Sequence, residues 1–287
     1  MRSHRLRAAA GGAGGLVTTN LNRHYDFGDT NSYSSSSFPT VNDLSGNGYG
    51  ATWENTQSLA PTFSSSNGGY VILGTNQVNY LKSDNTNIGG SSNTSFNQAL
   101  TRLAGTGNFT IEFWVNIHTP PSGYSSQYSY LYSDWPSEYI ITYNPFSLTI
   151  KNYRMSLYIQ NGGWGSFGLD GSSNIVGQGI QYSQWTTNTY TSTGNQGWEH
   201  IVVSRTSTGT NGLKFYRNNT LEFTGTNSIN YNCNVNVNST GDKTYGDRQY
   251  SGTLAGTYIA IIREYLYGFT AADVATNFNA DRARFGL

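Results

Sequence analysis

Apolar residues occupy every second position from residue 109 to residue 117, and this alternation constrains the fold more than any other feature of the sequence. They are Phe109, Ile111, Phe113, Val115 and Ile117. The residues between them are Thr110, Glu112, Trp114 and Asn116. A repeat of two is the period of a β-strand, whose successive side chains point to opposite faces of a sheet. The pattern therefore predicts a half-buried strand.

Further segments of the chain have the same character. The alternation returns at Ile201 and Val203, and residues 213–215 and 221–223 are predicted to pair as a hairpin across the polar turn 217–219, with both arms pointing into one core. Shorter alternations occur between residues 120 and 196, a region rich in Tyr, Ser, Gly and Trp. We interpret that region as strands joined by long loops, because no linker-like change of composition separates it from its neighbours.

The C-terminal residues predict one more strand and a closing helix. Residues 258–265 alternate with apolar character on both faces, which indicates a strand. Thr270 is then the predicted N-cap of a short helix, with Asp273 three residues later as the acidic partner of a capping box. One side of this helix is predicted to carry Ala271, Val274, Ala275 and Phe278.

The composition agrees with an all-β protein that has a neutral, polar surface. Only 11% of the 287 residues are charged, whereas 14% are aromatic, and the formal net charge is zero. The single cysteine, Cys233, has no partner for a disulfide within the chain and excludes a zinc site made of several cysteines. No apolar run is long enough to cross a bilayer, and the N-terminus lacks the apolar stretch of a secretory signal, so no membrane partner and no obvious export are expected.

The first fifteen residues differ from the rest of the chain. Arg2, Arg5 and Arg7 precede an Ala- and Gly-rich run that has the composition of a flexible spacer. We therefore expect an N-terminal arm, residues 1–15, followed by one domain, residues 16–287. Three cationic side chains are a weak electrostatic footprint for nucleic acid, so we expect the arm to contact a protein shell and not nucleic acid directly.

A family resemblance emerges from the order of these segments. The order runs from YDF at residue 25 and DLSGNG at residue 43 through NFTIEFWV, GWEHIVVSR, GLKFYRNN and GDR to YIAIIREYLY and the final helix. This order resembles the concanavalin A-like or laminin-G-like jelly-roll domain. The ending FNADRARFGL is similar to the close of such domains in virion proteins of tailed phages and other large viruses.

The resemblance implies a fold and a location. The fold is an all-β, two-sheet antiparallel jelly-roll sandwich of the concanavalin A-like type, with a short C-terminal helix and an N-terminal arm. The location is the virion, where the protein would be a capsid decoration, minor capsid or tail-associated component. Capsid or tail proteins would be its partners, and it would be present as a homo-oligomer or in many copies. The position of His200 in the family motif implies a structural role for this histidine.

Catalysis is not predicted. A retaining glycosidase needs two carboxyl groups about 5–5.5 Å apart, and glucanases of this fold carry them on one strand in a motif that this sequence lacks. Glu112, Glu199 and Glu222 each stand alone in the sequence. No nucleophile elbow of the G-x-S-x-G type is present. We therefore expect a non-enzymatic protein.

Two groups of oxygen-bearing side chains raise the question of calcium, although no cofactor is predicted. Asp26, Asp29 and Asn31 could supply oxygen ligands, as could the segment 43–47, which contains Asp, Ser and Asn. The same residues are typical of turns in which the side chain bonds its own backbone. We favour turns and keep calcium at Asp26, Asp29 and Asn31 as the alternative.

A set of aromatic residues marks a candidate contact surface. Its members are Tyr130, Trp135, Trp164, Tyr182 and Trp185. Aromatic side chains surrounded by amides and hydroxyls suit either a protein partner or a glycan. Two functions follow. The first is a structural virion protein, anchored partly by the arm with Arg2, Arg5 and Arg7. The alternative is a carbohydrate-binding, lectin-like adhesin that recognises glycans of a host surface.

Overall fold

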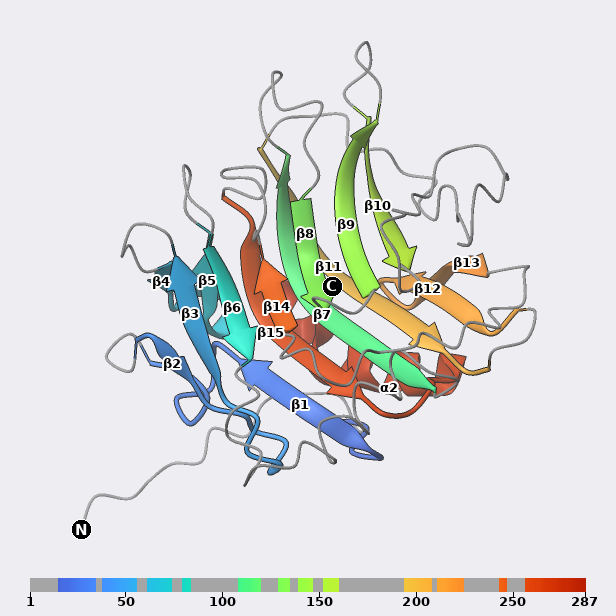
Figure 1. The fold of residues 1–287 in the computed structure, drawn as a ribbon, viewed down its shortest axis with the longest axis horizontal. Helices are drawn as coiled ribbons and strands as arrows, with labels where there is room; N and C mark the ends of the chain where they lie inside the picture. The colour runs from blue at the N-terminus through green and yellow to red at the C-terminus, as the bar shows by residue number, and fades with distance from the viewer. Residues whose placement is uncertain are drawn as a thin grey trace, which may run out of the picture.

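The computed structural model describes residues 15–34, 38–55, 61–73, 79–83, 108–119, 129–134, 139–146, 152–159, 194–207, 211–224, 243–246 and 256–287. Over these ranges the chain forms two antiparallel β-sheets and a short helix near the C-terminus (Figure 1). The predicted two-sheet sandwich with a C-terminal helix is confirmed. The predicted arm, with Arg2, Arg5 and Arg7, lies outside the described residues.

Over the described ranges, sheet A has eight strands and is built mostly from the strands that the alternation predicted. Its order is β13-β12-β11-β7-β15-β5-β4, and β1 also pairs with β15. The strands are β1 (Leu21–Asp26), β4 (Thr62–Ser64), β5 (Tyr70–Ile72), β7 (Phe109–Thr119), β11 (Gly194–Arg205), β12 (Leu213–Arg217), β13 (Thr220–Thr224) and β15 (Tyr258–Tyr265).

Sheet B, in the part of the chain that the structure describes, has seven strands in the order β10-β9-β8-β14-β6-β3-β2. They are β2 (Thr40–Val41), β3 (Ala51–Asn55), β6 (Asn79–Ser83), β8 (Ser129–Asp134), β9 (Tyr139–Phe146), β10 (Asn152–Ile159) and β14 (Lys243–Gly246). The predicted strand character of the region 120–196 is therefore confirmed for β8, β9 and β10.

The core between the sheets is apolar and contains a few polar links. The inward face of β7 carries Phe113 and Val115, both fully buried. Phe27, which follows β1, lies against Trp53 of β3 with ring centroids 5.8 Å apart. Tyr25 of β1 donates a hydrogen bond from its hydroxyl to Ser83 Oγ of β6. Side chains from both sheets therefore pack into one core.

The outward face of sheet A is covered by the C-terminal helix α2 (Ala271–Asp281) and by the short 3₁₀ helix η3 (Arg282–Phe285). Trp114 of β7 stacks on Phe278 of α2 and on Phe285 of η3, with ring centroids 5.8 and 4.3 Å apart. The prediction that β7 is half buried is therefore wrong. Its polar face, including Thr110 and Glu112, is fully buried because the helix packs on it. No helix within the described ranges combines the length and the apolar character needed to cross a membrane.

The helix begins as predicted, but its buried side differs in part. Thr270 is the N-cap and forms the capping box with Asp273. Val274 and Phe278 are buried as expected, together with Asn277, which the apolar pattern did not include. Ala271 is exposed, because it lies in the first turn on the solvent side.

The predicted hairpin is formed by β12 and β13, with one change in its register. The two segments pair as expected, and in the observed register Phe215 pairs with Phe223, while a shift between Phe215 and Tyr216 pairs Tyr216 with Leu221. Leu221 is 48% exposed as a result, and the prediction that it points into the core is wrong. An extra residue in one strand moves the following side chains to the other face of the sheet.

Candidate functional site

Tyr130 is the member of the predicted aromatic set that lies within the described residues, and it belongs to sheet B. It is in β8, between β9 and β14, and pairs with Thr142 of β9. Trp135, Trp164, Tyr182 and Trp185 lie outside the described residues. The structure therefore assigns one residue of the predicted set to a strand of sheet B.

The strand register assigns Tyr130 to a face of sheet B. The row that contains the fully buried Leu81 continues through Tyr245, Tyr132 and Ile141, each paired with the next. Thr142 follows Ile141 along β9, so Thr142 and its partner Tyr130 belong to the opposite face of the sheet. By backbone register, position 130 therefore belongs to the face of sheet B opposite to that of Leu81, which is the outward face.

This outward face combines hydroxyl-bearing and aromatic residues. One row across it reads Lys82, Thr244, Ser133, Ile140 and Tyr158. The neighbouring row contains Tyr130, Thr142 and Ser156. Hydroxyl groups both donate and accept hydrogen bonds, and phenol rings add a flat apolar surface, so such a composition suits a ligand that has many hydroxyls of its own. We take this outward face, which includes the position of Tyr130, as the candidate site.

The sequence identified Tyr130 but not the rows around it. In a regular strand, Tyr130 and Tyr132 would share one face, because they are two residues apart. A register shift between them places them on opposite faces. Local sequence contains no clear signal for this shift, so Thr142 and Ser156 could not have been grouped with Tyr130 from the sequence.

The acidic residues of sheet A are engaged in ion pairs. Glu112, on β7, has its Oε1 2.8 Å from Arg263 Nη1 and 2.9 Å from His200 Nε2, and its Oε2 accepts a 2.6 Å hydrogen bond from Asn277 Nδ2. Burial alone would raise the pKa of Glu112, but these partners outweigh burial and lower it to about 2. A general acid needs a raised pKa instead. His200 is fully buried in the same cluster, in agreement with the predicted structural role.

Two more carboxylates share one arginine. Glu199 of β11 and Glu222 of β13 lie 3.1 and 3.3 Å from nitrogens of Arg217 on β12. They are separated in the sequence, but the neighbouring strands bring them together. Because a guanidinium lies between them, they form a structural ion-pair cluster and not the water-accessible pair of a glycosidase.

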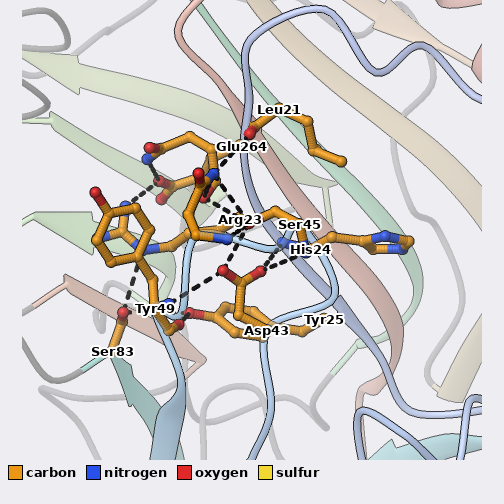
Figure 2. Close-up of polar contacts among 11 residues, drawn as sticks. Leu21, Arg23, His24, Tyr25, Asp43, Ser45, Tyr49, Ser83 and Glu264 are labelled. Carbon is orange, nitrogen blue, oxygen red and sulfur yellow. Dashed lines mark hydrogen bonds and ion pairs between the residues drawn. The ribbon is translucent and has the colours of Figure 1, made fainter. Parts of the chain in front are cut away.

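A further ion pair lies between the two sheets, as Figure 2 shows. Arg23 Nη1 of β1 is 2.6 Å from Glu264 Oε2 of β15, and both side chains are almost fully buried. Arg23 Nε also donates to Ser83 Oγ of β6, so this pair links sheet A to sheet B. Buried charges of this kind need close partners, and here the partners come from both sheets.

The residues weighed as calcium ligands make turn contacts and ion pairs. Both carboxylate oxygens of Asp26 accept from Arg284 Nη1 at 2.8 and 2.9 Å, and Asp26 Oδ1 also accepts from the backbone N–H of Gly28. Asp29 Oδ1 accepts from the backbone N–H and the amide of Asn31. Among the side chains described, no group of three or more His, Cys, Asp or Glu is arranged to hold a metal ion.

The second such segment attaches a loop to β1 (Figure 2). Asp43 Oδ1 accepts from the backbone N–H groups of His24 and Ser45, and Asp43 Oδ2 accepts from the Ser45 hydroxyl and the Tyr49 N–H. The amide of Asn47 donates to the carbonyl oxygen of Leu21. These bonds satisfy the edge of β1 that does not pair with β15, and edge strands need such protection against pairing with other chains.

Comparison with solved structures supports the fold. Domain 4 of AbnA, a GH43 extracellular arabinanase from Geobacillus stearothermophilus solved in complex with arabinotriose, is 15% identical. That match covers 91% of this chain and 98% of that domain, with a TM-score of 0.51. The binding domain of botulinum neurotoxin DC, in complex with SialylT, is 14% identical over 91% of this chain and 52% of that one, with a TM-score of 0.56.

A third similar structure is the binding domain of Paraclostridial Mosquitocidal Protein 1, which is 12% identical over 90% of this chain and 52% of that one, with a TM-score of 0.53. This chain thus spans about half the length of the two toxin domains, but nearly all of the arabinanase domain. At identities this low, the structural matches establish the shared β-sandwich fold alone. No protein-family model and no curated protein matches the sequence.

Proposed function

We propose that this chain is a non-catalytic carbohydrate-binding module that takes a neutral glycan on the outward face of sheet B. The observation that carries the proposal is the match to a complete arabinanase domain that was solved with arabinotriose bound. Glycan binding was the alternative in the sequence analysis, and it is now the better supported of the two functions. The predicted place on a virus particle stays a prediction.

The composition of the outward face supports a sugar ligand. A sugar presents hydroxyl groups around its ring and an apolar C–H face, so its binding site needs hydrogen-bonding groups beside aromatic rings. The row of Tyr130, Thr142 and Ser156 provides both residue types on neighbouring strands. The zero net charge of the chain favours a neutral glycan over an anionic one.

The state of the acidic residues supports binding without hydrolysis. Glu112, Glu199 and Glu264 are each ion-paired with an arginine. For Glu112 these contacts lower the pKa to about 2, so this carboxylate is a poor proton donor. Glu112 bonds Asn277 of the helix, Glu264 bonds Arg23, which reaches sheet B, and Glu199 joins two neighbouring strands of sheet A.

The proposal is tested by a glycan array, followed by calorimetric titration with arabino-oligosaccharides and other neutral oligosaccharides. We expect selective binding that Tyr130→Ala weakens about tenfold, which corresponds to about 1.4 kcal/mol. Trp135→Ala and Trp164→Ala test the predicted aromatic residues outside the described ranges. Leu221→Ala is the matched control, because Leu221 is an exposed apolar residue at the edge of sheet A and its loss should leave binding unchanged. A blank array, or equal losses in Tyr130→Ala and Leu221→Ala, contradicts the proposal.

A further inference from the structure

Gly246 is the last residue of β14, the central strand of sheet B, which lies between β6 and β8. It pairs with Tyr80 of β6. On the other side of β14, Tyr245 pairs with Tyr132 of β8, so the next row of β8 is the row of Gly246. Tyr130 occupies that row, as the pairing of β8 with β9 shows. A glycine position therefore lies between two tyrosine positions on three neighbouring strands.

These three positions belong to the outward face of sheet B. Leu81 is fully buried and pairs with Tyr245, so their row belongs to the inward face, and the adjacent row with Tyr80 and Gly246 belongs to the outward face. This is the row of the candidate site that contains Tyr130. From β3 to β10 it reads Glu54, Tyr80, Gly246, Tyr130, Thr142 and Ser156.

Gly246 leaves the middle of this row without a side chain. In the neighbouring outward row, every position from β3 to β10 carries one, and these are Thr52, Lys82, Thr244, Ser133, Ile140 and Tyr158. Glycine is depleted in strands because it has no side chain to pack, and where it occurs it often marks a place where a ligand approaches the backbone. Gly246 therefore marks one point of the candidate site.

The spacing of the strands at this point fits one sugar ring. Neighbouring strands lie about 4.8 Å apart, so the Tyr80 and Tyr130 positions, on either side of β14, are about 10 Å apart. A ring that contacts an aromatic ring on each face needs about 7–8 Å between the two aromatic planes, because non-bonded carbon atoms approach to about 3.5–4.0 Å. Two tyrosines on directly adjacent strands would be too close for such a ring, and a side chain at Gly246 would fill the space.

We propose that one sugar ring of the bound glycan lies over Gly246, between Tyr80 and Tyr130, and that the glycan continues along the same row toward Thr142 and Ser156. This inference rests on the proposed function and adds Tyr80 and Gly246 to its site. The two phenol rings provide apolar contacts for the C–H groups of the sugar, and the hydroxyl-bearing residues further along the row provide hydrogen bonds. The glycan consequently crosses the strands and does not run along one of them.

Calorimetric titration of the full chain tests the inference, with arabinotriose, cellotriose and the neutral oligosaccharide that binds best on the glycan array as probes. Gly246→Val introduces a side chain that strands accept, and it should weaken binding about 30-fold or more because it fills the space over β14. Tyr80→Ala should weaken binding about tenfold, as Tyr130→Ala does. Gly50→Val is the matched control and should bind as the wild-type chain does. Gly50 precedes β3 in the same sheet, outside the row, and the nearest atom to a Cβ there would be Val41 O at 3.4 Å.

The outcomes separate this inference from the proposed function. Wild-type affinity in Gly246→Val or in Tyr80→Ala overturns the inference and leaves the proposed function in place, as does an equal loss in Gly246→Val and Gly50→Val. A wild-type chain that binds neither the probes nor any glycan of the array overturns the proposed function, and the inference with it. Thermal unfolding establishes that each variant is folded. If Gly246→Val does not fold, Tyr80→Ala decides, and its unchanged affinity excludes a sugar ring at this position.

Discussion

At the scale of single residues, the buried carboxylate of Glu112 is the centre of the polar contacts under the helix. It touches Arg263, His200 and Asn277, and through Asn277 it is connected to the backbone N–H of Val17. A fully buried charge is stable only with such close partners, since water cannot reach it. Burial of each of these polar groups is therefore stable only while the others are in place.

Replacement of Glu112 should be one of the most damaging single changes in the domain. Glu112→Ala leaves Arg263 buried with Asp281 as its remaining anion, and removal of one member of a buried ion pair costs about 3–5 kcal/mol. The free energy of unfolding in urea measures the loss. Glu222→Ala is the control, because Arg217 keeps Glu199 and lies closer to solvent, so about 1 kcal/mol or less is expected. Equal losses in the two variants would show that burial does not set the cost.

The sequence predicted the face of Glu112 but not its partners. The alternation on β7 correctly separated Glu112 from the apolar residues. Asn277, however, is 165 residues away, and Arg263 is 151 residues away. Contacts at that separation depend on which strands become neighbours, and local patterns contain little information on that point.

At the scale of elements, the turn between β4 and β5 packs closely against the end of β1. Gly69, in this turn, has a φ of +113°, and a Cβ there would lie 2.5 Å from Gly28 Cα and 2.8 Å from Phe27 O. Arg284 of η3 donates to the carbonyl oxygens of Asn67 and Gly69 and bonds Asp26. Three distant segments therefore meet at one place where a side chain does not fit.

Gly69→Ala should destabilise the domain through this contact. Gly46 provides the comparison, since it also has a positive φ, of +86°, but a Cβ there would meet no atom within 4 Å. Gly46→Ala should cost about 1–2 kcal/mol for the left-handed backbone alone. Gly69→Ala should cost about 3 kcal/mol or more, because backbone atoms must also move. Thermal unfolding measures both, and a similar change in melting temperature for the two would rule out the steric contribution.

The sequence predicted regular elements well and irregular ones poorly. The capping box of Thr270 and Asp273 and the hairpin of β12 and β13 are local features, and both are present. The register shifts at Tyr130 and Tyr132, and at Phe215 and Tyr216, were not predicted. A bulge depends on how a strand fits its neighbours, so the face of every residue beyond it has to come from the structure.

At the scale of the whole molecule, the two outward faces of the sandwich have different surroundings. The C-terminal helix packs on sheet A through Trp114, Val274 and Phe278. In sheet B, the register assigns rows of Ser, Thr and Tyr positions, together with Lys82 and Ile140, to the outward face. The sequence predicted the sandwich and the helix, but which sheet the helix covers depends on long-range packing. That choice decides which face is the candidate site.

The N-terminal boundary of the domain gives a prediction at this scale. Val17 packs against the cluster of Val202, Tyr265, Phe269 and Val274, and its N–H donates to Asn277 Oδ1 at 2.9 Å. This bond orients the amide of Asn277 so that its Nδ2 reaches Glu112. Val17, in the segment that follows the predicted arm, therefore stabilises the position of the helix. The helix in turn holds Asn277 against Glu112 of sheet A.

Two truncated chains test this boundary. A chain of residues 16–287 keeps Val17 and should unfold at the same temperature as the full chain, as a domain boundary at residue 16 requires. A chain of residues 20–287 loses the apolar contact and the hydrogen bond, about 2 kcal/mol together, so its melting temperature should fall by about 4–8 °C. Calorimetry measures both. Loss of stability already in the 16–287 chain would place the boundary earlier, inside the predicted arm. Identical melting temperatures for the two truncated chains would mean that Val17 does not secure the helix.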